Sequence, residues 1–172
     1  MLLLFQPSST NTDLVFYYPG PPARVEPITN TPFFDVNGSY SPDGRAILYM
    51  SLESGVPELY VRNLAGNGEK IQLTTGEDVE SPLWSHNGRE VFYFSNRRGT
   101  VNSIEMTTNP DLKIGAKSTL FEFPLEVSGR GPAQRFVVSP DGQRFLMNRR
   151  SESASAQPFV LVQNWTSLLQ KK

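Results

Sequence analysis

The sequence predicts an all-β fold of short antiparallel strands, and three observations support it. Glycine (13) and proline (14) interrupt the 172 residues every few positions, and their combined share exceeds the average of about 12%. Between them lie apolar runs of four or five residues, too short for a typical helix: Ala46–Met50, Glu90–Phe94, Arg135–Val138 and Pro158–Val162. The third observation is an internal repeat. Only Trp165–Leu169, near the end, allows a helical turn.

The repeat consists of three segments that align on a serine. They are Tyr40–Ser51, Trp84–Ser95 and Val138–Asn148. Their serines at 41, 85 and 139 are 44 and 54 residues apart. Units of roughly 40–50 residues with several short strands each are typical of β-propeller blades. The strands after the serine turns are almost continuously apolar, which predicts burial on both faces between neighbouring sheets.

Each repeat begins with a turn whose residue types have a physical reason. Proline presets φ, aspartate or asparagine bonds to nearby backbone amides, and glycine supplies a positive φ. The predicted turn residues are Ser41, Pro42, Asp43 and Gly44; Ser85, Asn87 and Gly88; and Ser139, Pro140, Asp141 and Gly142. The residues that follow, Arg45, Arg89 and Gln143, are expected at the solvent-exposed rim.

The remaining strands complete a partial propeller of about three blades. Third and fourth strands are predicted at Glu58–Arg62, Lys70–Thr74, Val101–Met106, Ser118–Phe123 and Pro158–Gln163, with a polar loop at Thr107–Lys117. Asp13–Tyr18 and Arg24–Thr29 resemble the end of a preceding blade, and Leu2–Phe5 a strand remnant or frayed end. The predicted units are 13–30, 34–75, 79–124, a three-stranded blade at 134–164, and a tail at 165–172. Thirteen strands are too few to close a ring, because propellers have about 4–8 blades.

Composition excludes several classes of function. A net charge of −1 provides no excess of positive charge to attract nucleic acid, so we expect no nucleic-acid binding. The absence of cysteine excludes disulfides, thiolate metal sites and a cysteine nucleophile. No apolar run is long enough for a membrane helix, so no membrane insertion is expected. The single histidine, His86, lies inside a turn, and no nucleophile elbow is present. We therefore expect no enzyme activity, no cofactor and no metal.

A few charged residues are candidates for partner binding. Asp35, Asp78 and Glu80 precede the innermost strands, so their side chains are expected either to face a central channel and contact a cation or basic peptide, or to lie in solvated loops. The pairs Arg97–Arg98 and Arg149–Arg150 follow second strands and suit an acidic partner or a solvated rim. Trp84 is expected in the core between blades, and Trp165 is expected to pack the tail onto the last blade.

The units resemble the TolB-like β-propeller repeat family, a WD-repeat-like bacterial group. Tyr40–Ser51, Glu58–Arg62 and Ile71–Thr74 carry this resemblance, although the middle turn has His86-Asn87 in place of Pro-Asp. The second half is similar to the ends of propellers appended to bacterial serine/threonine kinases, on the residues Thr107–Gly115, Leu120–Glu122, Val138–Met147 and Val162–Trp165.

The resemblance implies a non-enzymatic module for protein interaction or ligand sensing within a larger bacterial protein. It favours an extracytoplasmic location. The alternative is the gating propeller of a prolyl-oligopeptidase-like peptidase, which predicts an adjoining nucleophile elbow. Because an unclosed ring leaves blade edges exposed, we also expect a homodimer through those edges.

Overall fold

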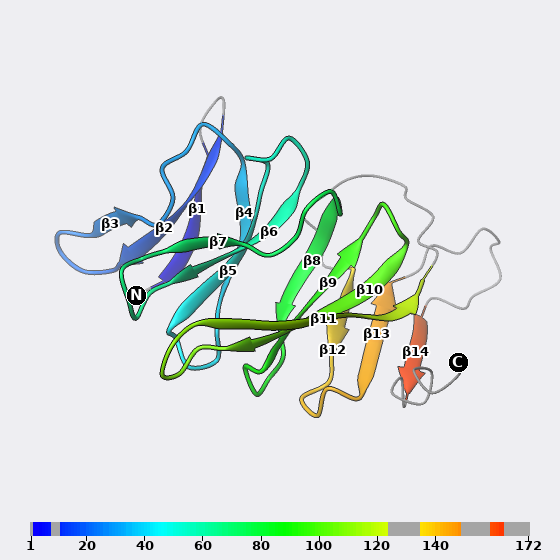
Figure 1. The fold of residues 1–172 in the computed structure, drawn as a ribbon. Coiled ribbons are helices and arrows are strands. Elements are labelled where there is room, and N and C mark those ends of the chain that lie inside the picture. The colour runs from blue at the N-terminus through cyan, green and yellow to red at the C-terminus, as the bar shows by residue number, and fades with distance from the viewer. Residues whose placement is uncertain (1, 8–10, 124–134, 149–158, 164–172) are drawn as a thin grey trace.

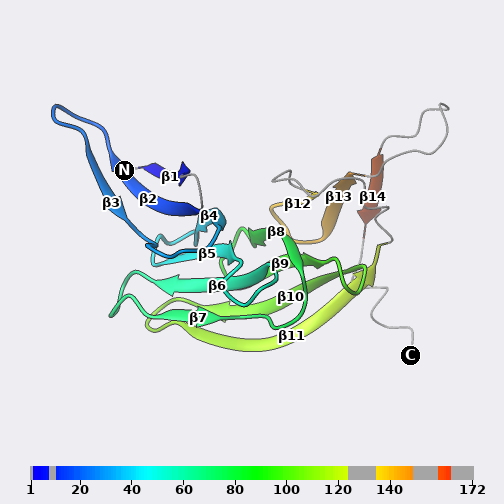
Figure 2. The ribbon, with the colours of Figure 1, turned by 90° about the horizontal axis from the view of Figure 1, so that it is seen from above.

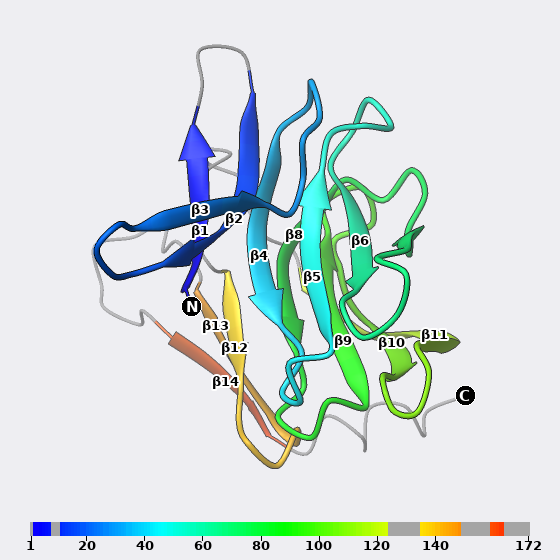
Figure 3. The ribbon, with the colours of Figure 1, turned by 90° about the vertical axis from the view of Figure 1, so that its left-hand side faces the viewer.

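Four antiparallel sheets follow one another along the chain. The computed structural model describes residues 2–7, 11–123, 135–148 and 159–163, which contain fourteen strands and no helix that could cross a bilayer. Each sheet is built from consecutive strands (Figure 1). Seen from above, the sheets form an open arc (Figure 2), and from the side β4–β6 run alongside β8–β10 (Figure 3). The all-β fold of propeller-type blades in an incomplete ring is therefore confirmed.

The strands of each sheet are hydrogen-bonded in sequence order. The first sheet contains β1 (Leu2–Pro7), β2 (Thr12–Tyr18) and β3 (Arg24–Pro27). The second contains β4 (Asp35–Tyr40), β5 (Ala46–Ser51), β6 (Glu58–Asn63) and β7 (Lys70–Gln72). The third contains β8 (Val79–Trp84), β9 (Glu90–Ser95), β10 (Thr100–Thr107) and β11 (Lys113–Glu122). The fourth contains β12 (Phe136–Val138), β13 (Arg144–Asn148) and β14 (Phe159–Gln163).

The first sheet has three strands where the sequence predicts two. The segment expected to be a remnant or frayed end pairs with β2 along its whole length, from Leu2 opposite Tyr17 to Pro7 opposite Thr12. The expected total of thirteen strands is therefore wrong by one. The apolar run in the sequence stops at Gln6-Pro7, but a proline is tolerated in an edge strand, where its missing N–H breaks no ladder.

The third sheet contains a second difference from the expectation. The predicted loop 107–117 is much shorter, because β11 begins at Lys113 and Thr107 pairs directly with it. The first seven residues of β11 are exposed. An exposed outer strand needs no alternating apolar residues, so its sequence resembles that of a loop.

The innermost strands of the second and third sheets carry the same bulge. Asn37 and Ser81 occupy equivalent repeat positions and have positive φ angles of 56° and 55°. The pairing register with the next strand shifts at this point in both sheets. Because a bulge bends a strand and increases its twist, the two inner strands share one curved shape.

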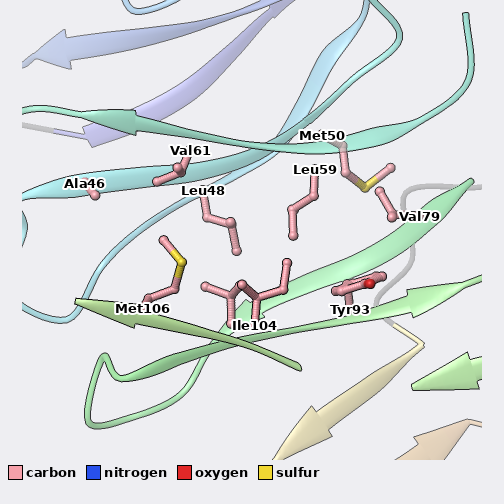
Figure 4. Close-up of a cluster of buried hydrophobic side chains, with 10 residues drawn as sticks. Ala46, Leu48, Met50, Leu59, Val61, Val79, Tyr93, Ile104 and Met106 are labelled. Carbon is pink, nitrogen blue, oxygen red and sulfur yellow. The ribbon is translucent and has the colours of Figure 1, made fainter. Parts of the chain in front are cut away.

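The core lies between the sheets. All six residues of β5 and five of the six in β9 are buried, which confirms the expected two-sided burial. Ile47 packs toward the first sheet and Leu48 toward the third. In the cluster between the second and third sheets, Leu48 and Ile104 point toward each other (Figure 4). Trp84 packs against this cluster, as predicted, and its Nε1 donates a hydrogen bond to the Ser39 carbonyl oxygen at 3.3 Å.

Among the described residues, the fourth sheet is packed on one face and exposed on the other. Phe145 and Met147 of β13 are fully buried, and the Phe145 ring lies edge-on to Phe92 of the third sheet. Leu146, between them, points to the opposite face and is 42% exposed. The repeat places Leu146 at the position of Leu48 and Phe92, which are both 0% exposed. The fourth sheet thus has the sequence of a packed blade on a face where Leu146 is exposed.

Candidate partner-binding surface

The sheets have two ends that are built differently. At the turn end, which points down in Figure 1, tight turns join β4 to β5, β8 to β9 and β12 to β13. At the connection end, which points up, lie the segments between β3 and β4, β5 and β6, β7 and β8, and β9 and β10. Loops at such ends are where a rigid scaffold usually presents its binding residues.

The three turns at the turn end make the same hydrogen bonds. Ser41 Oγ donates to Asp43 Oδ1 (2.6 Å) and accepts from the Ala46 N–H (3.0 Å), and the Gly44 N–H donates to the Ser41 carbonyl oxygen. Two other sets of residues take the roles of Ser41, Asp43 and Gly44: Ser85, Asn87 and Gly88, and Ser139, Asp141 and Gly142. The three glycines have φ near 70°, which favours glycine. These polar residues are therefore engaged in closing the turns.

Arg45 joins the turn of the second sheet to the hairpin tip of the third. Its Nε donates to the Thr108 carbonyl oxygen and its Nη2 to the Pro110 carbonyl oxygen, both at 2.9 Å. Thr108 Oγ1 donates to Asp43 Oδ2 at 2.7 Å. Burial alone would raise the pKa of Asp43, but hydrogen bonds from Ser41, Thr108 and the Arg45 N–H lower it overall. We call this arrangement the Arg45 clasp.

A polar cavity of about 750 Å³ opens beside the clasp. Arg89, Glu90, Glu105 and Thr108 are among its lining residues. Glu90 and Glu105 lie opposite each other in the β9–β10 pair. Burial raises the pKa of Glu90, and the charge of Glu105 raises it further, against a hydrogen bond from Ser103. The sequence gives no signal for this pair, because only the strand register brings the two carboxylates together.

At the connection end, backbone hydrogen bonds join loops of neighbouring sheets. The Leu52 N–H donates to the Phe34 carbonyl oxygen (3.2 Å), and the Val79 N–H donates to the Pro57 carbonyl oxygen (2.8 Å). In the loop between β9 and β10, the Asn96 N–H donates to the Asp78 carbonyl oxygen at 3.0 Å. The loops of the second and third sheets therefore form one continuous rim.

Two apolar and two basic side chains are exposed on this rim. Phe34 is 45% exposed and Val56 is 40% exposed. Arg97 Nη1 donates to a carbonyl of the β7–β8 segment at 3.1 Å, and Arg98 Nε lies 3.3 Å from Glu77 Oε2. Exposed aromatic and arginine side chains are enriched in protein interfaces. We call Phe34, Val56, Arg97 and Arg98 the connection-end patch.

Glu77 is a buried residue next to the patch that links the rim to strands of both sheets. Its side chain is 2% exposed and pairs with Lys117 Nζ at 2.6 Å as well as with Arg98. The Glu77 N–H donates to Glu58 Oε1 at 2.9 Å. Burial alone would raise the pKa of Glu77, but hydrogen bonds from Lys117 and Ser95 and the charges of Lys117 and Arg98 lower it.

The predicted acidic candidates have different environments. Asp35, the first residue of β4, is buried, and its Oδ2 accepts a hydrogen bond from Thr31 Oγ1 at 2.9 Å. Glu80 of β8 is also buried and pairs with Arg135 Nε at 2.7 Å. Asp78 is partly exposed on the connection-end rim. The structure thus brings Asp78 to the patch and keeps the side chains of Asp35 and Glu80 inside.

The remaining candidates lie either outside the described residues or at the opposite end of the sheets. Arg149, Arg150 and Trp165 lie outside the described residues, as does the predicted helical turn. His86 is exposed in the turn between β8 and β9, at the opposite end of the sheets. Within the described ranges, no three histidine or acidic side chains form a group that could hold a metal ion.

The similarity to known proteins lies in structure. No family model matches the sequence, and no curated protein matches it. TolB from Acinetobacter baumannii is 18% identical with a TM-score of 0.60, over 94% of this chain and 37% of that protein. A candidate TolB from Agrobacterium tumefaciens is 16% identical with a TM-score of 0.59, over 95% and 57%. Oligogalacturonate lyase from Vibrio parahaemolyticus is 18% identical with a TM-score of 0.54, over 86% and 36%.

This chain spans less than two thirds of the length of each of these proteins. At such identities the likeness concerns the fold. It agrees with the bonds of the serine turns, the two-sided burial of β5 and β9 and the arc of sheets. The four sheets are therefore consecutive blades of a TolB-like β-propeller fold.

Proposed function

We propose that the chain is a non-enzymatic β-propeller module, part of a larger bacterial protein, that binds a protein or peptide partner. The observation that carries the proposal is the connection-end patch, where exposed Phe34 and Val56 share a rim with two exposed arginines. The rigid sheets beneath fix the positions of these loops. The larger protein is supported by coverage, since the chain spans only 37% of the TolB that it matches.

The patch also indicates the chemistry of the partner. Phe34 and Val56 favour an apolar side chain that covers them. Among the described residues, Arg97 has a carbonyl partner and no ion pair, so its guanidinium is available to a carboxylate. Arg98 is shared with Glu77 and contributes less. We infer a peptide segment that combines an apolar residue with an acidic one.

The non-enzymatic part of the proposal has separate support. His86, the one histidine, is at the turn end and away from the patch. The fold itself decides nothing, because one propeller scaffold hosts many functions, and one of the matched proteins is a lyase. Turnover of a peptide or glycan library by the purified chain would overturn this part.

The test is a selection of displayed random peptides on the immobilised chain. We expect enriched peptides to contain an acidic and an apolar residue, and Phe34→Ala and Arg97→Glu each to weaken their binding by about tenfold or more. Ile114→Ala is the matched control, because Ile114 is 41% exposed on β11 and outside the patch. Enrichment that both patch variants retain would contradict the proposed surface.

A further inference from the structure

A second cavity, of about 400 Å³, lies between the second sheet and residues 27–31, which connect β3 to β4. The described residues along its wall include Tyr49 of β5, Arg62 of β6 and Lys70 of β7, and none of them is acidic. Its volume falls in the range of about 300–1,000 Å³ that small-molecule sites occupy. The cavity is therefore a candidate ligand site with a positively charged lining.

Arg62 is fixed in position at this cavity. Its Nη1 donates to the Ile28 carbonyl oxygen at 2.5 Å, which ties the guanidinium to the connection of the first sheet. Among the described residues, its Nε and Nη2 have no acceptor. Gly68 lies beside these nitrogens, where a Cβ would be 3.6 Å from Nη2. Arg62 therefore presents free donors to a group that carries oxygen acceptors.

Tyr49 adds a hydroxyl from the buried side of the cavity. The residue is 1% exposed, yet it lines the cavity. Its hydroxyl has no hydrogen-bond partner in the part of the chain that the structure describes, although buried hydroxyls usually have one. Burial raises the pKa of Tyr49, and the charge of Asp35 raises it further against the charge of Arg62. The hydroxyl thus stays protonated and can donate to an acceptor.

The junction between the second and third sheets has a lysine at the position of Lys70. Lys70 pairs with Arg62 across β7 and β6, and Lys117 pairs with Ile104 across β11 and β10. Arg62 and Ile104 are equivalent, because each lies opposite the sixth residue after the serine of its turn. Lys70 and Lys117 are therefore equivalent as well.

In that junction a carboxylate of the chain meets the lysine and a tyrosine. Glu77 Oε1 lies 2.6 Å from Lys117 Nζ, which is 5.5 Å from the centre of the Tyr93 ring. Burial raises the pKa of Tyr93, and the nearby charge of Glu77 also raises it, against Lys117. Tyr93 lies eight residues after the serine of its turn, as Tyr49 does. The equivalents of Lys70 and Tyr49 thus border a buried carboxylate.

Thr31 has the position of Glu77 in the junction that contains the cavity. The Glu77 N–H donates to Glu58 Oε1 at 2.9 Å. The Thr31 N–H donates to Asp13 Oδ1 at 3.1 Å. Glu58 and Asp13 are equivalent, because the residue after each donates its N–H to a threonine hydroxyl of the following connection. Thr31 carries no carboxylate, and its hydroxyl donates to Asp35, which is not a lining residue.

We propose that this cavity binds a small molecule through a carboxylate, which takes the place that the Glu77 carboxylate has in the next junction. Arg62 and Tyr49 donate hydrogen bonds to its oxygens, and bonds to a charged acceptor are the strong ones. Lys70 is shared with the partly exposed Glu53 and contributes less. The site uses no residue of the connection-end patch, so it is independent of the proposed partner.

The first test is a titration of the purified chain with succinate at constant ionic strength, followed by NMR at the Arg62 Nε–H and the Thr31 amide. We expect a saturable shift of both signals. Succinamide, the neutral analogue, should cause none, because it carries no charge for the guanidinium. No saturation with succinate, or an equal response to succinamide, would overturn the proposal. Tighter binding of inorganic phosphate than of succinate would overturn the assignment to a carboxylate.

The second test compares three variants at the Thr31 amide. Tyr49→Phe should raise the dissociation constant of succinate about tenfold and leave the urea midpoint unchanged, because the hydroxyl has no partner among the described residues. Arg62→Gln should raise the constant about tenfold or more. Arg89→Gln, the control, removes a guanidinium at the turn end and should change it by less than about twofold, because salt screens a distant charge.

Two outcomes of this comparison would contradict the site. Unchanged succinate affinity in Tyr49→Phe would mean that the hydroxyl does not meet the ligand. Equal losses in Arg62→Gln and Arg89→Gln would mean that succinate is attracted by positive charge in general and not by this cavity.

Discussion

A single buried carboxylate, that of Glu77, connects three segments of the third sheet and its neighbour. The carboxylate pairs with Lys117 of β11 and Arg98 of the β9–β10 loop, and the backbone N–H of Glu77 donates a hydrogen bond to Glu58 Oε1 of β6. The two cationic side chains are more than a third exposed, so solvent screens their attraction. Glu77 therefore contributes to stability mainly because it joins Lys117, Arg98 and Glu58, which lie in different strands or loops.

This arrangement predicts a pH dependence of stability. The folded-state pKa of Glu77 lies below its usual 4.5, so its contribution is complete above about pH 4.5 and is lost as the pH falls through the folded pKa. Glu77→Gln should lower the free energy of unfolding at pH 7 by about 1–2 kcal/mol and flatten this acid limb. Urea unfolding between pH 3 and 7 measures both effects. The exposed Glu122→Gln is the control, and equal acid limbs for wild type and Glu77→Gln would contradict the assignment.

Prediction from sequence succeeds at the residue scale where the chemistry is local. The bonds of Ser41, Asp43 and Gly44 span five residues, so the turn can be predicted without knowledge of the rest of the chain. The partners of Arg45 lie 63 and 65 residues away, and nothing near Arg45 indicates them. The buried states of Asp35 and Glu80 likewise depend on neighbours that only the fold supplies.

At the scale of elements, the hairpin of β10 and β11 is positioned by the Arg45 clasp. The strand β11 is mostly exposed and forms the outer edge of its sheet, so its own packing gives the hairpin tip little support. The clasp adds two charge-assisted hydrogen bonds to backbone carbonyls of the tip. The same exposure explains why the sequence predicts a loop where β11 begins, since no buried alternation marks the strand.

Arg45→Lys tests the clasp. Lysine cannot reproduce the two-pronged contact of the guanidinium, so we expect a loss of about 1 kcal/mol in the free energy of unfolding and faster amide exchange in the hairpin tip. Arg89→Lys is the matched control, because Arg89 has the same repeat position and its side chain makes no hydrogen bond or ion pair among the described residues. Equal effects of the two variants on hairpin exchange would argue against the clasp.

For the whole molecule, packing depends on the place of a sheet in the arc. The interior sheets bury both faces of their second strands, whereas the fourth sheet buries one. The sequence predicts the repeated strands but not this difference, because Leu48 and Leu146 follow the same motif. Whether a residue at this position is buried depends on whether a neighbouring sheet packs against that face, and the motif does not encode this.

The two leucines provide a direct comparison. Leu48→Ala should cost about 2–5 kcal/mol, because it opens a cavity between two sheets. Leu146→Ala should cost about 1 kcal/mol or less in dilute solution, where the free face stays solvated. Thermal or urea unfolding of both variants at low protein concentration measures the difference. Similar losses would mean that the fourth sheet is covered in the single chain.

Among the described residues, the core clusters between sheets join immediate neighbours in the arc, and in energetic terms this makes the molecule a one-dimensional array. In such arrays stability is approximately a sum of unit and nearest-neighbour terms, so opening starts at the ends. Hydrogen exchange should then be slowest in β5 and β9 and faster in β2 and β13, with the boundary moving inward as denaturant is added. Uniform exchange across all four sheets would mean a single cooperative unit. Under the graded pattern, the terminal blades fray and reclose while the two middle blades stay folded.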